Sequence, residues 1–405
     1  MKRQNVFTAI IGGGAAGLMC ALKAAENNPG RSILILEKAD RVGKKLLVTG
    51  NGRCNLSHIG AGAKSYHGDG SEELINILFK NYNPDIVLSY FNRLGLMTTA
   101  DSEGRIYPRS NLATSVLDIL RMRLNDRGVK EACGVDIREI RKMHSGYEII
   151  AGDACISCEK LVIAVGGKAD YAGRESGASV IKDLGLATVK PTPSLSPVKV
   201  ESDIIRSLKG VRISARVSLI HHDEIIKQER GEVQFTESAL SGICIFDLSR
   251  YANRNPGCEI AVALLPEMSD DAILAELKRR IDLNHDGALS DIFIGLFHKN
   301  IGIALIKSAG MKPSVLCTDI SDTELKALAH TINDWRFKTL PRYDFKNAQV
   351  TAGGVKLSEI NHHTFETKRH KGLYIIGEAL DIDGDCGGYN LQFAFASGMC
   401  AGDHI

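Results

Sequence analysis

Three glycines and one glutamate near the start of the chain have the spacing of a dinucleotide-binding turn. Gly12, Gly14 and Gly17 follow the pattern G-x-G-x-x-G directly after an apolar run that begins at Val6. Such glycines permit a tight turn, a close approach of the backbone to a pyrophosphate, and close packing of the next helix on the sheet. Glu37 ends the next apolar run, where a carboxylate accepts hydrogen bonds from the hydroxyls of an adenosine ribose. The four residues predict a dinucleotide site.

A second glycine-rich connection lies near the end of the chain, over 372–402. An apolar strand is predicted over 373–376, and it ends at Gly377 and Glu378. A glycine-rich loop then opens a helix at about Tyr389. In two-part flavin folds a carboxylate at this position contacts the ribityl chain, and the positive end of the following helix faces the ring atoms that gather negative charge on reduction. The two ends of the chain together predict FAD bound by a discontinuous domain.

A buried strand predicted over 161–165, followed by Gly166, adds a further edge to this site, because a small residue lets the backbone run close to the dinucleotide. The residues expected to contact the cofactor are Gly12, Gly14, Ala15, Ala16, Gly17, Glu37, Lys38, Lys45, Gly52, Arg53, Gly166, Gly377, Glu378, Gly388, Tyr389, Asn390 and Leu391. No second G-x-G-x-x-G stands at a strand-to-helix junction, so a separate NAD(P)H domain is not expected. NAD(P)H is instead expected as a transient reductant, unless electrons leave to oxygen.

The order of the predicted elements suggests more than one domain in these 405 residues. Strand and helix patterns alternate over the first 130 or so residues, as βαβ units do. Prolines between 191 and 197 interrupt this pattern, and alternating strands up to 265 predict an antiparallel barrel or sandwich. Helical periods follow over 272–281, 289–309 and 322–331.

Composition weighs against several other classes of protein. Fifty Lys and Arg residues stand against 48 Asp and Glu residues, and a net charge of +2 gives no excess for nucleic acid or an anionic membrane surface. The apolar run near the N-terminus is short and leads straight into the glycine turn, so a cytoplasmic location is expected. Ten irregularly spaced cysteines fit a reducing compartment.

Two small patterns that could suggest other chemistry have simpler interpretations. Cys155 and Cys158 form a C-x-x-C, but they lead into a predicted strand, whereas a redox dithiol stands at the N-terminus of a helix. The histidine pairs at 221–222 and 362–363 lack metal-ligand spacing. Neither a redox dithiol nor a metal site is expected.

Four motifs resemble a specific bacterial flavoprotein family: GNGRCN at 50–55, GRIYPRSN at 104–111, TAGGV at 351–355 and GEALDIDGDCGGYNLQ at 377–392. The family includes BaiN-like bile-acid ene reductases, aminoacetone-oxidase-like flavoproteins and ribosomal RNA dihydrouridine synthases. The resemblance spans nearly the whole chain and implies an α/β fold in which an insertion splits a Rossmann-like FAD-binding domain. We expect that domain at 1–190 and 346–405, an inserted antiparallel β-barrel at 191–268 and a helical subdomain at 269–345.

Several side chains in these motifs could act on a substrate. A flavin carries the electrons, so the protein must position the substrate and supply or remove a proton. The expected catalytic residues are Cys54, Cys386 and Tyr389, and the expected substrate-binding residues are Arg105, Tyr107 and Arg109. Tyr107 is an alternative proton donor, and the planar guanidinium of Arg53 could hold a carbonyl or a cofactor phosphate.

The sequence is compatible with four functions. The leading hypothesis is reduction of an activated carbon–carbon double bond in a small conjugated carbonyl compound, with NAD(P)H as the electron source. A second is reduction of a uridine ring in ribosomal RNA, against which the small net charge argues mildly. A third is an amine oxidase, of aminoacetone type, that produces hydrogen peroxide. A fourth is a flavin-binding sensor without catalysis.

Overall fold

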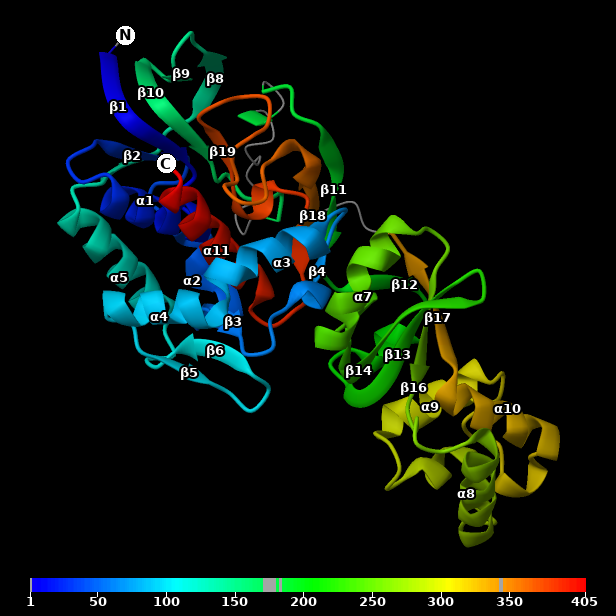
Figure 1. Cartoon of the computed structure of the whole chain (residues 1–405). Coiled ribbons are helices and arrows are strands. Elements are labelled where there is room, and N and C mark those ends of the chain that lie inside the picture. Colours follow the sequence, from blue (N-terminus) through cyan, green and yellow to red (C-terminus); the bar gives the residue numbers. More distant parts are fainter. Residues whose placement is uncertain (1, 170–179, 182–183, 342–344) are drawn as a thin grey trace. The chain divides into compact units, whose positions relative to one another are not determined.

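The computed structural model describes residues 2–169, 180–181, 184–341 and 345–405, and the chain divides into two units (Figure 1). Unit 1 contains residues 1–192 and 349–405, and unit 2 contains residues 193–348. Each unit has its own hydrophobic core. Unit 1 is therefore formed by the two ends of the chain, and unit 2 is an insertion.

The main sheet of unit 1 has the strand order β7–β2–β1–β10–β9–β8, and β19 also pairs with β10. Five strands of this sheet pair in parallel with one another: β7, β2, β1, β10 and β19. Strand β9 is antiparallel to both of its neighbours, β8 and β10. The bounds of the strands are β1 Lys2–Ile11, β2 Ile33–Glu37, β7 Lys130–Cys133, β8 Ile137–Lys142, β9 Tyr147–Ala151, β10 Ala154–Ile163 and β19 Leu373–Ile375.

The central strands are short runs of branched apolar side chains that are buried on both faces. Ile10, Ile35 and Val162, for example, have no exposed surface. Such continuous runs are typical of parallel strands that are covered by other elements on both sides. Register places Ile11 opposite Ile163, and Ile163 opposite Ile375. The carboxyl ends of these strands therefore meet at one edge of the sheet.

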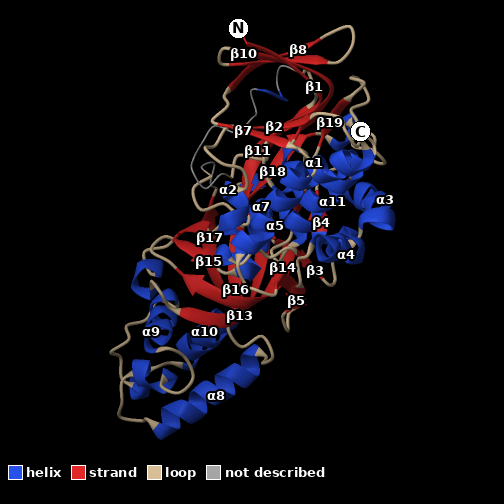
Figure 2. Ribbon diagram, turned by 90° about the vertical axis from the view of Figure 1, so that its left-hand side faces the viewer, coloured by secondary structure: helices blue, strands red, loops and turns tan. Residues whose placement is uncertain are grey.

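Two helices that begin at this edge pack closely against each other (Figure 2). They are α1 (Ala15–Asn27), which follows β1, and α11 (Tyr389–Asp403), which follows β19 and a loop. Gly398 of α11 allows the close approach, because a Cβ atom there would lie 2.5 Å from the carbonyl oxygen of Ala16. Gly402, one turn later, lies in the same way against the Cβ atom of Lys23. Small residues of α11 thus let its middle and C-terminal turns pack directly on α1.

The rest of unit 1 consists of smaller elements. Helix α4 shows clear local signals: Asn83 caps its N-terminus by accepting a hydrogen bond from the Ile86 N–H at 3.0 Å, and Gly95 ends it in a left-handed conformation. The small sheets are β3–β6–β5, β20–β4 and β11–β18. The helices are α2 Lys44–Val48, α3 Ser71–Tyr82, α4 Pro84–Leu94 and α5 Ala113–Asp126, and the strands are β3 Ser57–His58, β4 Tyr66–His67, β5 Thr98–Ala100, β6 Arg105–Pro108, β11 Thr188–Ser194, β18 Val350–Val355 and β20 Asp383–Gly384.

Unit 2 contains a closed antiparallel barrel with the order β12–β15–β14–β13–β16–β17. Its strands are β12 Val198–Glu201, β13 Arg212–His221, β14 Glu224–Phe235, β15 Ala239–Ser241, β16 Glu259–Ala263 and β17 Trp335–Leu340. Helix α7 (Ile243–Arg254) packs against β14.

The helices α8 (Asp270–Leu283), α9 (Lys299–Ser308) and α10 (Asp322–Asn333) lie between the last two barrel strands in sequence. This order corrects the expected boundary at 269–345. β17 lies within that range, yet it pairs with both β12 and β16 and closes the barrel. The helical subdomain is therefore an insertion into the barrel rather than a segment after it. Among the described residues, no helix is both long and apolar enough to span a membrane.

Candidate functional site

The glycine turn after β1 has the geometry that a dinucleotide requires. Gly12 has a φ of +104°, and a Cβ atom there would collide with the carbonyl oxygen of Ala164. A Cβ atom at Gly17 would collide with the carbonyl oxygen of Gly12. Around Gly14, by contrast, the described part of the chain places no atom within 4 Å of the Cβ position. Two glycines thus close the turn and the third faces open space, as expected for a residue beside a pyrophosphate.

The start of α1 presents backbone donors beside that space. The first hydrogen bond of the helix runs from the Leu18 N–H to the Gly14 oxygen at 2.9 Å. The N–H groups of Ala15 and Ala16 precede this bond and have no partner inside the helix. Together with the helix dipole, such groups form a site for phosphate oxygens. The structure therefore fits the predicted role of this segment.

Glu37 at the end of β2 is held next to the glycine turn. Its Oε2 atom accepts the Gly13 N–H at 2.7 Å, and its Oε1 atom accepts the Ala39 N–H at 2.7 Å. Lys38 instead directs its ammonium group to Asp136 at 3.5 Å. A carboxylate has about four acceptor positions, so Glu37 retains capacity for the hydroxyls of a ribose.

The structure places one further residue beside Glu37. Register places Cys133, the last residue of β7, opposite Glu37. Burial raises the pKa of the Cys133 thiol, and the charges of Glu131 and Glu37 raise it further. The strand is only four residues long and half of its residues are charged, so its sequence carried little signal.

A second group of hydrogen-bonded residues surrounds Glu378, which follows β19 at the carboxyl edge of the sheet. Its Oε2 atom lies 2.5 Å from the Lys45 ammonium, and its Oε1 atom accepts the Thr351 N–H at 2.8 Å. Thr351 is almost fully buried, and its Oγ1 atom accepts the Ala169 N–H at 2.8 Å. Gly167 lies against this group, because a Cβ atom there would lie 2.7 Å from Glu378 Oε1 and even closer to Thr351. Sequence reasoning included Lys45 and Glu378 but not Thr351.

The 50–55 loop has an unusual backbone and a buried thiol. Gly50, Asn51, Gly52 and Cys54 all have positive φ values. The Cys54 side chain has no exposed surface, and burial raises the pKa of its thiol to about 12. The prediction that Cys54 donates a proton is therefore corrected: the thiol is enclosed by protein atoms and holds its proton tightly.

Arg53, next to this thiol, lies on the surface. Its guanidinium stacks over the Tyr107 ring at 4.5 Å from the centroid, and its Nε atom donates to the Gly50 oxygen at 3.2 Å. Tyr107 is 5% exposed, so it supports Arg53 rather than projecting toward a ligand. The pair forms a planar charged surface beside the loop.

The two other arginines of the predicted substrate group differ from each other. Arg105 is paired with Asp101 at 2.7 Å and with Glu103 at 2.9 Å, both in its own hairpin. These carboxylates already compensate the charge of Arg105, and its binding of an anionic substrate stays a prediction. Arg109 is exposed and remains a candidate.

The loop before α11 packs directly on the 50–55 loop. Gly388 has a φ of +102°, and a Cβ atom there would collide with the Ser57 oxygen and lie 2.6 Å from Asn55 Oδ1. Tyr389 stacks on His58, with ring centroids 4.8 Å apart. The two most specific sequence motifs are therefore neighbours in space, although more than 330 residues separate them.

The side chain of Asn390 shapes this loop. Its Oδ1 atom accepts the Gly384 N–H at 2.8 Å, and its Nδ2 atom donates to the Gly384 oxygen at 2.8 Å. Because the side chain is used inside the protein, Asn390 and Leu391 have only their backbone N–H groups, in the first turn of α11, for a cofactor. Cys386 is partly exposed in the same loop.

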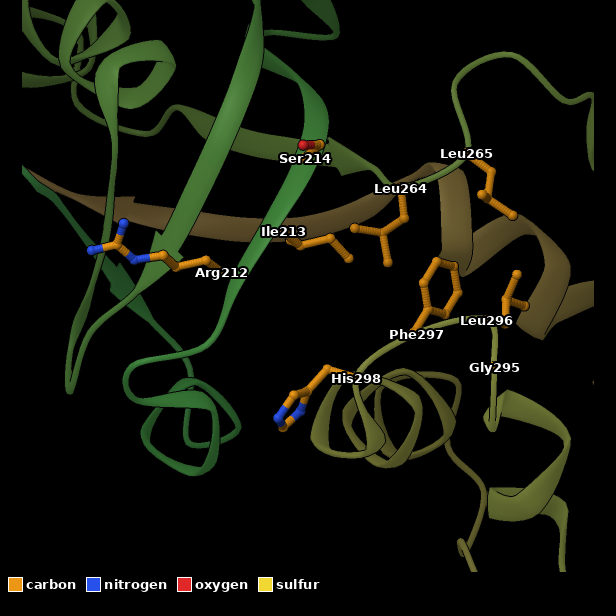
Figure 3. Close-up of a pocket in the computed structure, with 9 residues that line it drawn as sticks. All are labelled: Arg212, Ile213, Ser214, Leu264, Leu265, Gly295, Leu296, Phe297 and His298. Carbon is orange, nitrogen blue, oxygen red and sulfur yellow. The ribbon is translucent and has the colours of Figure 1, made fainter.

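A cavity of about 410 Å³ lies elsewhere, between the barrel and the helical insertion of unit 2. Ile213, Leu264 and Phe297 turn toward one another at this cavity, whereas Arg212 points away (Figure 3). None of its lining residues belongs to the sequence-predicted site.

The four strand ends, two helix N-termini and two carboxylates define a Rossmann-type flavoprotein site that fits FAD. The chain belongs to the family described as the HI0933-like protein Rossmann domain, which it matches over residues 6–404. The predicted family, fold class and enzyme class are confirmed. The protein is an FAD-dependent oxidoreductase.

Two relatives cover nearly the same length as this chain. A 3-dehydro-bile acid delta(4,6)-reductase from Clostridium scindens is 33% identical over 97% of both chains. A ribosomal RNA dihydrouridine synthase from Escherichia coli is 26% identical over 98% of this chain and 97% of its own.

Two solved structures share the fold. The 3-ketosteroid delta1-dehydrogenase from Sterolibacterium denitrificans covers 99% of both chains, with a TM-score of 0.50 and 11% identity. A quinol-fumarate reductase with menaquinol molecules aligns with 100% of this chain over 71% of its own, with a TM-score of 0.51 and 14% identity.

Proposed function

We propose that the protein reduces an activated carbon–carbon double bond of a conjugated carbonyl compound, with NAD(P)H as the source of electrons. The observation that carries this proposal is the 33% identity to a relative named as a bile-acid reductase, over 97% of both chains. The match covers nearly the whole chain, in which the loops at 50–55 and 384–390 pack against each other.

The residues of unit 1 have separate tasks in this proposal. Glu37 and the first turn of α1 would hold the adenosine and phosphate end of the cofactor, and Glu378 and the first turn of α11 would hold the flavin end. FAD, when bound, supplies hydride transfer, which protein side chains cannot provide. The protein must therefore place the substrate and control one proton.

In this proposal a protein group would deliver the proton to the carbon beside the carbonyl group. Cys386 Sγ and Tyr389 Oη are the remaining candidates for this proton, because Cys54 is enclosed. Arg53 and Arg109 are exposed cations of the predicted motifs and would attract a carbonyl or carboxylate oxygen.

The proton donor can be identified by substitution. We expect either Cys386→Ser or Tyr389→Phe to lower kcat about 100-fold and to alter the pH profile, while FAD remains bound. Cys155→Ala is the matched control, since this thiol lies near the start of β10, at the opposite end of the strand from the site. Products formed in D₂O should carry deuterium beside the carbonyl group. If both variants keep the wild-type rate and pH profile, the proton comes from another group.

A second candidate function is reduction of uridine in ribosomal RNA. Full-length relatives at 26% and 24% identity are named as ribosomal RNA dihydrouridine synthases. Binding to ribosomal RNA that weakens steeply with salt, together with loss of uridine absorbance on turnover, would favour this function. The net charge of +2 makes the small-molecule substrate the first choice.

A further inference from the structure

The Glu378 carboxylate is held by two different parts of the chain. Lys45 contacts one oxygen from α2 at 2.5 Å, and the Thr351 backbone contacts the other from β18 at 2.8 Å. The Lys45 and Glu378 side chains are 36% and 20% exposed, so the ion pair borders open space rather than lying sealed in the core. Both oxygens are fixed in position, yet the carboxylate retains acceptor capacity for a further hydroxyl group.

Thr351 joins this carboxylate to the turn after β10. Its Oγ1 atom accepts the Ala169 N–H at 2.8 Å, and both groups are buried. The contact with Gly167 is so close that no larger residue would fit beside Thr351. A buried N–H group that loses its acceptor is costly, so the Thr351 hydroxyl sets the position of β18 and, through it, the Thr351 N–H that Glu378 accepts.

The opposite charges of Lys45 and Glu378 also matter for the cofactor. Lys45 and Glu378 together carry no net charge, whereas Glu378 alone would place a negative charge beside a cofactor that gains negative charge on reduction. A nearby negative charge disfavours reduction, and a nearby positive charge favours it. Lys45 therefore compensates the carboxylate that the flavin end of the site requires.

We propose that Lys45, Glu378 and Thr351 form a clasp in which Thr351 positions Glu378 on the cofactor and Lys45 sets the ease with which the cofactor is reduced. Thr351 is a positioning residue, because it acts through Glu378. The clasp concerns the cofactor alone and does not depend on which substrate accepts the electrons.

The first test measures the midpoint potential of the FAD-loaded protein against reference dyes, without substrate. We expect Lys45→Met to shift the ratio of reduced to oxidised flavin at least tenfold toward the oxidised form, about 30 mV for two electrons. Glu378→Gln should shift it in the opposite direction, and the double variant should lie close to wild type. Lys44→Met is the matched control, because Lys44 pairs with the exposed Asp40.

The second test measures FAD affinity by titration of the apoprotein. We expect Thr351→Val to weaken binding about tenfold and to change the visible circular dichroism of the flavin, whereas Thr351→Ser keeps the hydroxyl and stays within twofold of wild type. The clasp is overturned if Lys45→Met and Lys44→Met have the same potential. It is overturned equally if Thr351→Val binds FAD as wild type does, or if Thr351→Ser fails to restore binding.

Discussion

At the scale of single residues, Glu37 shows how a short sequence signal acquires a defined geometry. Both of its oxygens accept backbone N–H groups at 2.7 Å, from Gly13 and Ala39. The carboxylate is therefore oriented before any ligand arrives, and the glycine turn is attached to the end of β2. Hydrogen bonds to a charged acceptor are about twice as strong as those between neutral groups.

Glu37→Gln should weaken FAD binding at least tenfold, about 1.4 kcal/mol. The amide of the variant carries no charge. Its NH₂ group would face one of the two backbone N–H groups that donate to Glu37 in the wild type. Titration of the apoprotein with FAD measures the effect. Glu131→Gln on the neighbouring strand is the control, because Glu131 pairs with Arg121. Equal affinities of the two variants would contradict the assignment.

Residue types predicted the backbone geometry of the glycine turn better than the surroundings of the reactive side chains. Gly12, Gly14 and Gly17 have conformations and contacts that follow from their spacing. The role expected for Cys54 failed because its enclosure depends on a run of left-handed residues in the 50–55 loop, which a sequence pattern does not reveal. Thr351 was missed because its partners, Ala169 and Glu378, are distant in sequence.

At the scale of elements, the approach of α1 and α11 decides where two helix N-termini lie. Gly398 permits this approach, since the nearest atom to its Cβ position is the Ala16 oxygen at 2.5 Å. That oxygen belongs to the first turn of α1, the same turn that would hold phosphate. Packing in the middle of α11 is thus coupled to the geometry of the cofactor site.

Gly398→Ala should destabilise the protein by about 2 kcal/mol and weaken FAD binding, because the added methyl group moves one helix away from the other. Chemical denaturation and FAD titration measure the two effects. Gly62→Ala is a suitable control, since its backbone is extended and the nearest described atom lies 4.0 Å from the Cβ position. A Gly398→Ala protein with unchanged stability and affinity would show that the helices are not tightly coupled.

At the scale of the whole molecule, the split of the cofactor unit by an insertion could be predicted, because both ends of the chain carry dinucleotide motifs. The closure of the barrel could not. β17 pairs with β12 across more than 130 residues. Because helices are inserted between β16 and β17, no local sequence pattern indicates that these two strands pair. Alternating patterns indicate strands, but they do not state which strands meet.

Buried thiols in several elements of unit 1 should make the whole protein sensitive to alkaline pH. Burial raises the pKa of Cys54, Cys158 and Cys400 to about 12, from an ordinary value of 9.0. The unfolded chain loses these protons first as pH rises, so the stabilisation is complete below about pH 9 and is lost between pH 9 and 12.

We expect the free energy of unfolding to fall by about 1 kcal/mol per thiol between pH 8 and pH 10, measured by urea denaturation. A variant with alanine at positions 54, 158 and 400 should show a smaller fall. The same pH dependence in the wild type and this variant would contradict the explanation.

Anaerobic stopped-flow spectroscopy of the FAD-loaded protein, at the flavin band at about 450 nm, tests directly whether the protein is a nicotinamide-dependent reductase. We expect rapid bleaching by NADH or NADPH, followed by recovery of the band when a conjugated enone is added. Bleaching by amines alone, with no response to a nicotinamide or to an enone, would contradict this expectation and identify an oxidase instead.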